Sequence, residues 1–401
     1  MKKIGILRES RVPVERRVAL LPKHLQQIQE RYPNISFYVQ PYSHRCISDE
    51  EYAQVGAYLT EDLSDCDILL GIKEVKPELL LPNKTYLFFS HTIKKQSHNK
   101  VLLQNILAKN IRLIDYECIT NDLGERLIAF GRFAGLVGAY NTLRAILLRY
   151  QKQDLKPAYQ CQDLSEIQQI LKTIYLPACK IVITGTGRVG KGAVEIMHMA
   201  GVEQVSPQNF LTKNYAKPVF TALHSLEYHK LKENIDIASQ NFYLFPQNYI
   251  SDFIKYARVA DVLITTHFWS PQAPKLFTLQ EARQADFKIK VIGDISCDIN
   301  GSVPCTVQTS TIDNPFYDYN PYTEQVEPPF SDTRNITIMA IDNLPCELPK
   351  DASDYFGTQF VRYVLPALLG EDKDGVLARA TIAQYGELTP RFSYLADFVS
   401  L

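Results

Sequence analysis

Five side chains that could bind or transfer protons follow three apolar runs in the first third of the chain. In chain order they are Lys73, Glu74, His91, Lys94 and Glu117. Each apolar run predicts a buried strand, and parallel strands bring their carboxyl ends to one rim of a sheet, where open α/β folds bind ligands. We therefore expect these side chains to converge on one cleft.

This set of groups suits the condensation of an amine with a keto acid, followed by reduction of the imine. Such chemistry needs groups that move protons around carbonyl, carbinolamine and imine intermediates. Histidine titrates in the useful range, and burial can lower the pKa of a lysine. Glu74 and Glu117 could hold a cationic substrate. A single charged residue at a strand end is usually a solvated turn, so the coincidence at three strand ends is what favours a functional site.

A glycine-rich loop, Gly185-Thr186-Gly187-Arg188-Val189-Gly190, follows an apolar run at 180–184 and opens a helical pattern over 191–200. In a dinucleotide-binding fold the first glycine permits the tight turn, and the second lets the backbone approach the pyrophosphate. The third allows close helix–strand packing. The helix N-terminus then offers N–H groups and a positive dipole to the phosphates. A tight turn without a ligand is the alternative interpretation.

An acidic residue that would bind the ribose hydroxyls, expected about 20 residues after such a loop, is not evident. Ser206 is expected near the end of the second strand, with Glu203 before that end and Lys213 a little beyond it. A neutral or basic strand end favours a 2′-phosphate slightly. The expected cofactor is therefore NAD or NADP, with a slight preference for NADP.

Length, charge and cysteine spacing set the broad class. A chain of 401 residues is too long for one ordinary core, so two domains are expected. With Lys+Arg 43 against Asp+Glu 44, a nucleic-acid or acidic-membrane partner is not expected. No apolar run approaches the ~18 residues of a membrane span. The eight cysteines form no CxxC pair, which predicts no metal and reduced thiols in a cytoplasmic protein.

Strand and helix patterns alternate, as is typical of α/β proteins with mostly parallel sheets. The predicted strands are 3–7, 35–40, 66–72, 85–90, 111–116, 180–184, 261–266, 289–295 and 336–341. The predicted helices are 22–32, 48–57 with a capping box at Ser48, 133–150, 191–200, 352–369 and 376–385. The Pro- and Tyr-rich segment 313–332 is expected to be an ordered excursion.

Several segments resemble one enzyme family. Residues 16–22 (RRVALLP) are similar to the N-terminal signature of the alanine dehydrogenase and transhydrogenase superfamily. Residues 84–94 (KTYLFFSHTIK) resemble the lysine–2-oxoglutarate reductase half of bifunctional aminoadipic semialdehyde synthase and, more loosely, fungal lysine-forming saccharopine dehydrogenase. Further matches cover nearly the whole chain, at 111–117, 184–187, 293–298, 341–345 and 348–357.

The resemblance implies two Rossmann-like domains with parallel sheets around a central cleft. Residues 1–140 plus 345–401 would form the substrate domain, and residues 141–344 the dinucleotide-binding domain. The implied reaction interconverts lysine, 2-oxoglutarate and reduced cofactor with saccharopine and oxidised cofactor. The glutamate-forming half of the bifunctional enzyme is expected to be absent, because the chain ends soon after this unit.

The resemblance also implies residue roles, with Lys73 and His91 as the acid–base pair. The positions matching substrate contacts are Arg17, Glu74, Lys94, Glu117, Arg126 and Phe130. The two arginines would grip substrate carboxylates through paired hydrogen bonds. The residues expected on the nicotinamide side are Phe268, Ile341, Asp342, Asn343 and Leu344, with Asp342 beside the reacting groups.

Two other functions stay open from the sequence. One is an alanine dehydrogenase-like enzyme acting on another amino acid, and the other is a non-catalytic sensor that keeps the dinucleotide fold. Around the predicted catalytic histidine, the segment 88–94 differs from the sequence that alanine dehydrogenases carry, which argues against the first of these. The physiological direction and the oligomeric state are not predicted.

Overall fold

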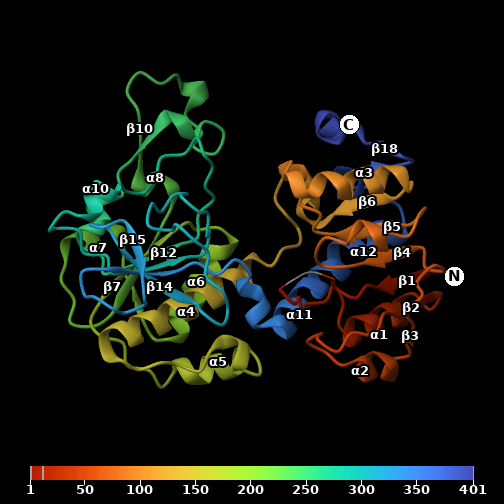
Figure 1. Cartoon of the computed structure of the whole chain (residues 1–401), viewed down its shortest axis with the longest axis horizontal. Coiled ribbons are helices and arrows are strands. Elements are labelled where there is room, and N and C mark those ends of the chain that lie inside the picture. The colour runs from red at the N-terminus through yellow and green to blue at the C-terminus, as the bar shows by residue number, and fades with distance from the viewer. Residues whose placement is uncertain (1, 11–12, 401) are drawn as a thin grey trace. The chain divides into compact units, whose positions relative to one another are not determined.

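Alternating strands and helices build two units in the computed structural model, which describes residues 2–10 and 13–400 (Figure 1). Unit 1 comprises Met1–Phe130 with Pro349–Leu401, and unit 2 comprises Gly131–Leu348. The chain thus crosses between units at 130/131 and 348/349, where the sequence places the crossings at 140/141 and 344/345. Among the described residues no helix combines the length and the apolar character needed to cross a membrane.

Unit 1 holds an eight-stranded sheet in the order β18-β17-β6-β5-β4-β1-β2-β3. The parallel strands are β1 (Lys2–Ile6), β2 (Ile35–Val39), β3 (Tyr58–Leu59), β4 (Ile68–Leu70), β5 (Thr85–Phe88) and β6 (Arg112–Asp115). The antiparallel strands are β17 (Thr381–Gln384) and β18 (Glu387–Leu388). The buried middle residues of the central strands are apolar, as in β4 and at Leu113 and Ile114 of β6, which is why the sequence shows them as apolar runs. The five strands predicted in this region are confirmed.

Helices and short turns connect these strands. They are α1 (Pro22–Arg31), α2 (Asp49–Gln54), α3 (Lys100–Ala108), α11 (Pro349–Gln359), α12 (Leu365–Leu369), α13 (Val376–Ala380) and α14 (Ala396–Val399). The capping box predicted at Ser48 is confirmed, since its Oγ accepts from the backbone N of Glu51. The predicted helix 352–369 is interrupted by a π-helical turn, Phe360–Val364. Pro366 follows this turn and has no N–H to continue the regular ladder.

The predicted helix 376–385 is wrong beyond Ala380. From Thr381 the chain becomes β17, which pairs antiparallel with β6. Ile382 is fully buried in the core of unit 1. At the end of β17, Tyr385 at φ 55° and Gly386 at φ 78° turn the chain into β18. A short apolar run is compatible with either a helix or a strand. Here the segment forms a strand because the edge of β6 is free to pair with it.

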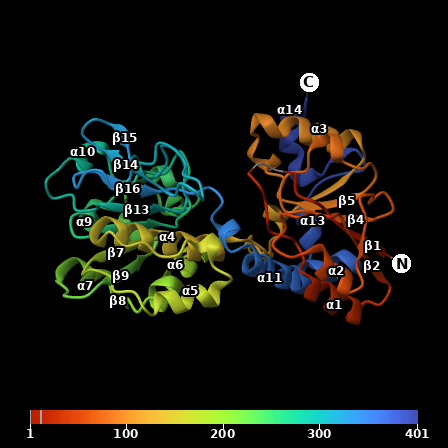
Figure 2. The same cartoon turned by 60° about the horizontal axis from the view of Figure 1, so that its bottom comes forward.

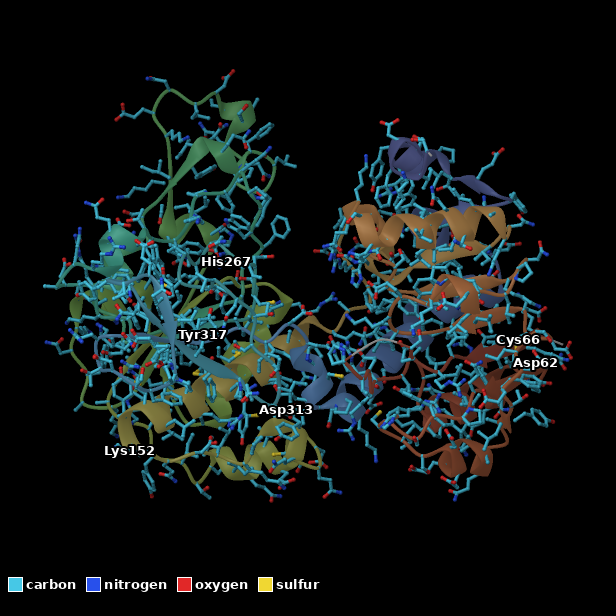
Figure 3. The ribbon with its side chains drawn as sticks, viewed as in Figure 1. Asp62, Cys66, Lys152, His267, Asp313 and Tyr317 are labelled. Carbon is cyan, nitrogen blue, oxygen red and sulfur yellow. The ribbon has the colours of Figure 1, made fainter. Side chains whose placement is uncertain are left out.

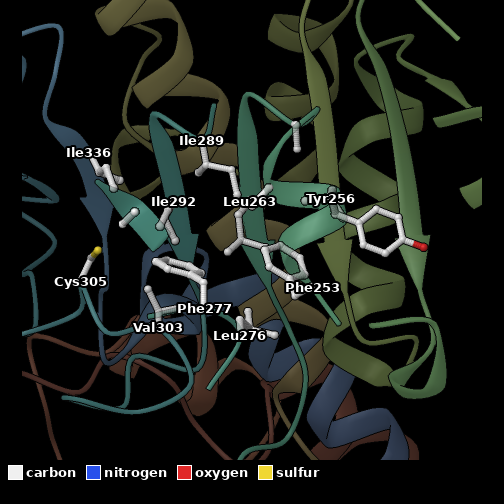
Figure 4. Packing of buried hydrophobic residues seen from close by; sticks show 14 of the residues in the cluster. Phe253, Tyr256, Leu263, Leu276, Phe277, Ile289, Ile292, Val303, Cys305 and Ile336 are labelled. Atoms are coloured by element: carbon white, nitrogen blue, oxygen red, sulfur yellow. The ribbon is translucent and has the colours of Figure 1, made fainter. Parts of the chain in front are cut away.

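Unit 2 holds a second eight-stranded sheet, in the order β15-β14-β16-β13-β12-β7-β9-β8. The parallel strands are β7 (Lys180–Thr184), β8 (Glu203–Gln204), β9 (Val219–Leu223), β12 (Val262–Thr265), β13 (Val291–Asp294) and β16 (Ile336–Met339). The segment 313–332 is ordered, as predicted, and forms the antiparallel edge hairpin of β14 (Phe316–Asn320) and β15 (Gln325–Glu327). Figure 4 shows Phe253, Leu263, Phe277 and Ile292 packed in the core of this unit.

The helices of unit 2 are α4 (Gly131–Gln151), α5 (Leu164–Leu171), α6 (Arg188–Met199), α7 (Pro207–Thr212), α8 (Ser225–Tyr228), α9 (Ile254–Ala257) and α10 (Leu279–Ala282). A separate two-stranded sheet pairs β10 (His229–Leu231) with β11 (Tyr249–Ser251). Helices α4 and α6 lie side by side (Figures 1 and 2). A Cβ at Gly135 would overlap the carbonyl oxygen of Val189, and one at Gly192 would overlap that of Arg132. The two backbones therefore touch where these glycines lie.

Candidate functional site

The histidine predicted as an acid–base group lies just beyond β5 in an unusual backbone conformation. His91 has φ 52°, a left-handed conformation that few residues other than glycine adopt. Its ring Nδ1 pairs with Oε1 of Glu74, which follows β4. A carboxylate on Nδ1 holds the proton of the neutral ring there and leaves Nε2 as the basic nitrogen. The structure thus brings two predicted site residues together, and the predicted contact of Glu74 with substrate stays a prediction.

Lys73 is positioned by a residue that the sequence interpretation missed. The two carboxylate oxygens of Glu9, which follows β1, accept from the backbone N of Ile72 at 2.6 Å and of Lys73 at 3.0 Å. Burial, with Glu15 nearby, raises the pKa of Glu9 to about 7. An acidic residue just after the first strand was the available signal, because β1 and β4 are neighbours in the sheet.

The end of β6 is tied to the segment after β5 by Asp115. Its carboxylate accepts from the backbone N of Ser90 at 3.1 Å, from Ser90 Oγ at 2.5 Å and from the backbone N of Glu117 at 2.7 Å. Burial raises the pKa of Asp115. This buried carboxylate therefore holds together the turns that carry His91 and Glu117.

Three further predicted substrate contacts lie together in unit 1. Arg126 Nη2 binds Glu117 Oε1 at 2.5 Å, and Lys94 Nζ lies 3.8 Å from Glu117 Oε2. A cavity of about 500 Å³ opens beside them. Its lining residues are Glu117, Cys118, Thr120, Gly124, Arg126, Arg391, Phe392 and Tyr394. Two cations around one carboxylate leave this cluster positive, which suits an anionic ligand.

Arg17 is buried and already holds a carboxylate. Its Nε and Nη2 donate to the two oxygens of Glu15 at 2.8 and 2.7 Å, and its guanidinium lies 4.2 Å from the ring centre of Phe130. The Phe130 ring in turn stacks on Phe356, with centroids 4.6 Å apart. Two predicted site residues, Arg17 and Phe130, are therefore neighbours. Glu15 is a further partner of Arg17 that the sequence analysis did not predict.

The glycine loop of unit 2 has the shape that a pyrophosphate requires. Gly185 has φ +100°, and a Cβ there would lie 2.8 Å from the backbone N of His267. A Cβ at Gly190 would overlap the carbonyl oxygen of Gly185, whereas one at Gly187 would meet no atom within 4 Å. Gly187 is the N-cap of α6, and no side chain caps the helix there. The loop thus leaves open space beside the first-turn N–H groups, which fits a dinucleotide.

Two side chains that follow β12 contact the loop and the last residue of the strand before it. Thr266 Oγ1 donates to the carbonyl oxygens of Thr184 at 2.7 Å and Gly185 at 3.1 Å. Nδ1 of His267, labelled in Figure 3, lies 2.7 Å from Thr184 Oγ1, and burial lowers the pKa of this histidine to about 3. The sequence interpretation missed both residues, although Thr266 ends the predicted strand 261–266 and His267 directly follows it.

The remaining predicted cofactor contacts are spread over unit 2. Arg188 and Val189 begin α6. Ser206 follows the edge strand β8, where its Oγ caps α7 by accepting from Asn209 N at 3.3 Å.

The residues predicted on the nicotinamide side follow two strands of one sheet. Phe268 follows β12 and is 72% exposed. Ile341, Asp342, Asn343 and Leu344 follow β16, separated from β12 by β13 alone. Because the three strands are parallel, both segments belong to the carboxyl rim of the sheet, where Rossmann-like folds bind dinucleotides.

The sequence matches two domain families. "Alanine dehydrogenase/PNT, N-terminal domain" matches residues 5–137, and "Alanine dehydrogenase/PNT, C-terminal domain" matches residues 158–389. Mitochondrial alpha-aminoadipic semialdehyde synthase of Rattus norvegicus is 30% identical, over 95% of this chain and 46% of that protein. The Arabidopsis thaliana synthase is 31% identical, over 98% and 41%. The chain thus spans less than half the length of these relatives.

Another relative matches over most of its own length. Saccharopine dehydrogenase [NAD(+), L-lysine-forming] of Emericella nidulans is 24% identical over 90% of both chains. Among solved structures, an L-alanine dehydrogenase superposes with a TM-score of 0.65 at 15% identity, covering 99% of this chain and 100% of the other. A transhydrogenase from Sinorhizobium meliloti gives 0.60 at 14% identity, with 97% and 99% covered. These structural likenesses support the two-domain Rossmann-like fold.

Proposed function

The chain belongs to the alanine dehydrogenase/PNT family of oxidoreductases, and from that premise we propose that it interconverts lysine plus 2-oxoglutarate with saccharopine. The observation that carries this proposal is the pairing in unit 1 of His91 with Glu74, the residue that directly follows Lys73. Likeness to the synthases over 95% of this chain favours these substrates. The cofactor is a nicotinamide dinucleotide.

The proton transfers of this reaction match the groups in unit 1. The lysine ε-amine attacks the keto carbon of 2-oxoglutarate and loses a proton. The hydroxyl of the resulting carbinolamine gains a proton and leaves as water, which leaves a protonated imine. When bound, the reduced nicotinamide supplies a hydride to the imine carbon, which gives the secondary amine of saccharopine. In the proposal Nε2 of His91 and Nζ of Lys73 accept and return these protons, and Glu74 holds the histidine ring in position.

Substrate carboxylates require cationic partners. We assign this role to Arg126, with Lys94 beside it. Arg17 would share the role by exchanging Glu15, which its Nε and Nη2 bind here, for a substrate carboxylate. Glu117 offsets part of that positive charge and can also bind the substrate ammonium group. In unit 2 the loop 185–190 and the first turn of α6 would hold the pyrophosphate, and Phe268 and the segment 341–344 would lie on the nicotinamide side.

The substrate pair is tested by absorbance at the reduced-nicotinamide band with the purified chain. We expect reduced cofactor to be consumed only when lysine and 2-oxoglutarate are both present. Comparable turnover with ammonia and pyruvate would replace the proposal with an alanine dehydrogenase activity. Cofactor binding without turnover of either substrate pair would replace the proposed reaction with a non-catalytic sensor function.

Gly187→Val tests the dinucleotide loop. Since a Cβ at Gly187 meets no atom within 4 Å, the fold should accommodate valine while its methyl groups occupy the space of the pyrophosphate. We expect the dissociation constant of the cofactor, measured by calorimetry, to rise at least about tenfold, a loss of ~1.4 kcal/mol, with an unchanged melting temperature.

Gly190→Val is the contrasting variant for this test. Its side chain would collide with the carbonyl of Gly185, so the melting temperature itself should fall. Unchanged cofactor affinity in the Gly187→Val protein would show that the phosphates bind elsewhere.

A further inference from the structure

An arginine near the end of the chain, Arg391, belongs to the same rim of the sheet as the predicted acid–base residues. β17 pairs antiparallel with both β6 and β18, so β18 runs in the same direction as β6. The 3₁₀ turn Pro390–Leu395 follows β18, just as Glu117 follows β6 and His91 follows β5. Phe392 is buried in the core of unit 1, which fixes the position of this turn. The fold therefore places Arg391 at the carboxyl ends of the central strands.

Arg391 brings an uncompensated positive charge to the cavity beside Glu117. It lines this cavity together with Arg126, and within the described part of the chain its guanidinium forms no hydrogen bond or ion pair. Burial raises the pKa of the Cys118 thiol to about 12, and the positive charges of Arg126 and Arg391 both oppose this rise. Both guanidinium groups therefore lie near the same lining residue. Of the described residues that line the cavity, Glu117 alone carries a carboxylate, and it is already paired with Arg126.

The positive charge around this cavity exceeds what the neighbouring side chains neutralise. Lys94 lies 3.8 Å from Glu117 Oε2, and Lys95 Nζ lies 5.4 Å from the ring centre of Tyr394, which also lines the cavity. The whole chain has a formal net charge of −1, so this excess is local. The volume of about 500 Å³ is typical of small-molecule sites. A cationic hollow of this size suits a small ligand with more than one negative group.

We propose that Arg391 binds the distal carboxylate of the keto acid, while Arg126 and Lys94 bind the carboxylate next to the keto group. The inference rests on the proposed function in taking a keto acid as the substrate, and it adds the residue that selects a dicarboxylic one. A guanidinium suits this role because it donates two parallel hydrogen bonds to one carboxylate. Pyruvate has no second carboxylate and would leave Arg391 unpaired, so 2-oxoglutarate binds more tightly.

Arg391→Ala and Arg31→Ala form a matched pair for the test. Each removes one exposed guanidinium from unit 1, but Arg31 ends α1 and is not among the residues that line this cavity. A third variant, Arg391→Lys, keeps the charge and loses the paired hydrogen bonds. 2-Oxoglutarate and pyruvate are titrated separately by calorimetry into the full chain saturated with reduced cofactor, with no lysine or ammonia present.

The expected result is specific to one position and one keto acid. The dissociation constant of 2-oxoglutarate should rise at least about tenfold in the Arg391→Ala protein, because a charged carboxylate loses its partner. The affinity for pyruvate should not change, and Arg391→Lys should restore part of the affinity for 2-oxoglutarate. The Arg31→Ala protein should bind both keto acids as the wild type does. The melting temperature of Arg391→Ala should also match the wild type, because its guanidinium has no partner in the described part of the chain.

Four results would each overturn the inference. They are a wild type that does not prefer 2-oxoglutarate to pyruvate, unchanged affinity for 2-oxoglutarate in Arg391→Ala, an equal loss for both keto acids, and an equal loss in Arg31→Ala. Because the titrations involve no turnover, their outcome is separate from that of the proposed reaction. A chain that binds 2-oxoglutarate through Arg391 but consumes no reduced cofactor when lysine is added would refute the reaction alone.

Discussion

Lys73→Met and His91→Gln should each lower the turnover rate by about a hundredfold or more, the size of effect that general acid–base groups contribute. Cofactor affinity should change little, because both residues belong to unit 1 and the glycine loop to unit 2. Steady-state rates with lysine and 2-oxoglutarate, together with a fluorescence titration of the cofactor, separate these two effects.

The pH dependence of the rate distinguishes a chemical role from a structural one. Each single variant should lose one limb of the pH profile, since one titrating group has been removed. The double variant should lose less than the product of the single effects, because groups that act as a unit are not additive. Near-normal turnover of Lys73→Met with an unaltered profile would remove this lysine from the mechanism.

Glu347→Gln should stabilise the protein at alkaline pH and leave it unchanged in acid. Glu347 is buried in unit 2, where its Oε1 accepts from Asn141 Nδ2 at 2.8 Å, and burial raises its pKa from 4.5 to about 7. The folded state therefore binds this proton more tightly, so the stabilisation is complete below pH 4.5 and is lost as the pH rises through 7. A shift of this size corresponds to about 3 kcal/mol. Glutamine mimics the protonated acid at every pH.

Denaturant titrations at pH 4 and pH 8 measure this difference. The unfolding free energy of Glu347→Gln should match the wild type at pH 4 and exceed it at pH 8, by up to ~3 kcal/mol. Glu233→Gln is the matched control, because Glu233 is exposed and its substitution should have little effect at either pH. A Glu347→Gln protein less stable than the wild type at pH 8 would show that the native state needs the ionised carboxylate.

Much of the fold could be predicted because the parallel strands are covered on both faces. Such strands are uniformly apolar, and this makes runs such as 68–70 and 262–265 easy to find. The glycine loop could also be predicted from the sequence, because its three glycines are required by the local backbone conformation, which depends little on the rest of the chain. The strand-end residues Glu74 and His91 were predicted to lie near each other, and the structure pairs them, whereas their roles at a site stay predictions.

What could not be predicted depends on partners far along the chain. The 381–384 segment becomes a strand because β6 offers a free edge more than 260 positions earlier. The place of β9 between β7 and β8 is likewise a tertiary choice that local pattern does not record. Glu9 and Glu15 looked like ordinary charged loop residues, and only the folded chain shows one accepting from the Lys73 backbone and the other holding Arg17.

The glycine contact between α4 and α6 has a mechanical consequence. Helix α4 starts at Gly131, where the chain enters unit 2, and α6 starts at the glycine loop. At Gly135 and Gly192 the two backbones touch, and the Arg132–Glu195 ion pair also joins the helices. We therefore expect the two helices to move as one body, so that a displacement at Gly131 would also displace the glycine loop at the start of α6.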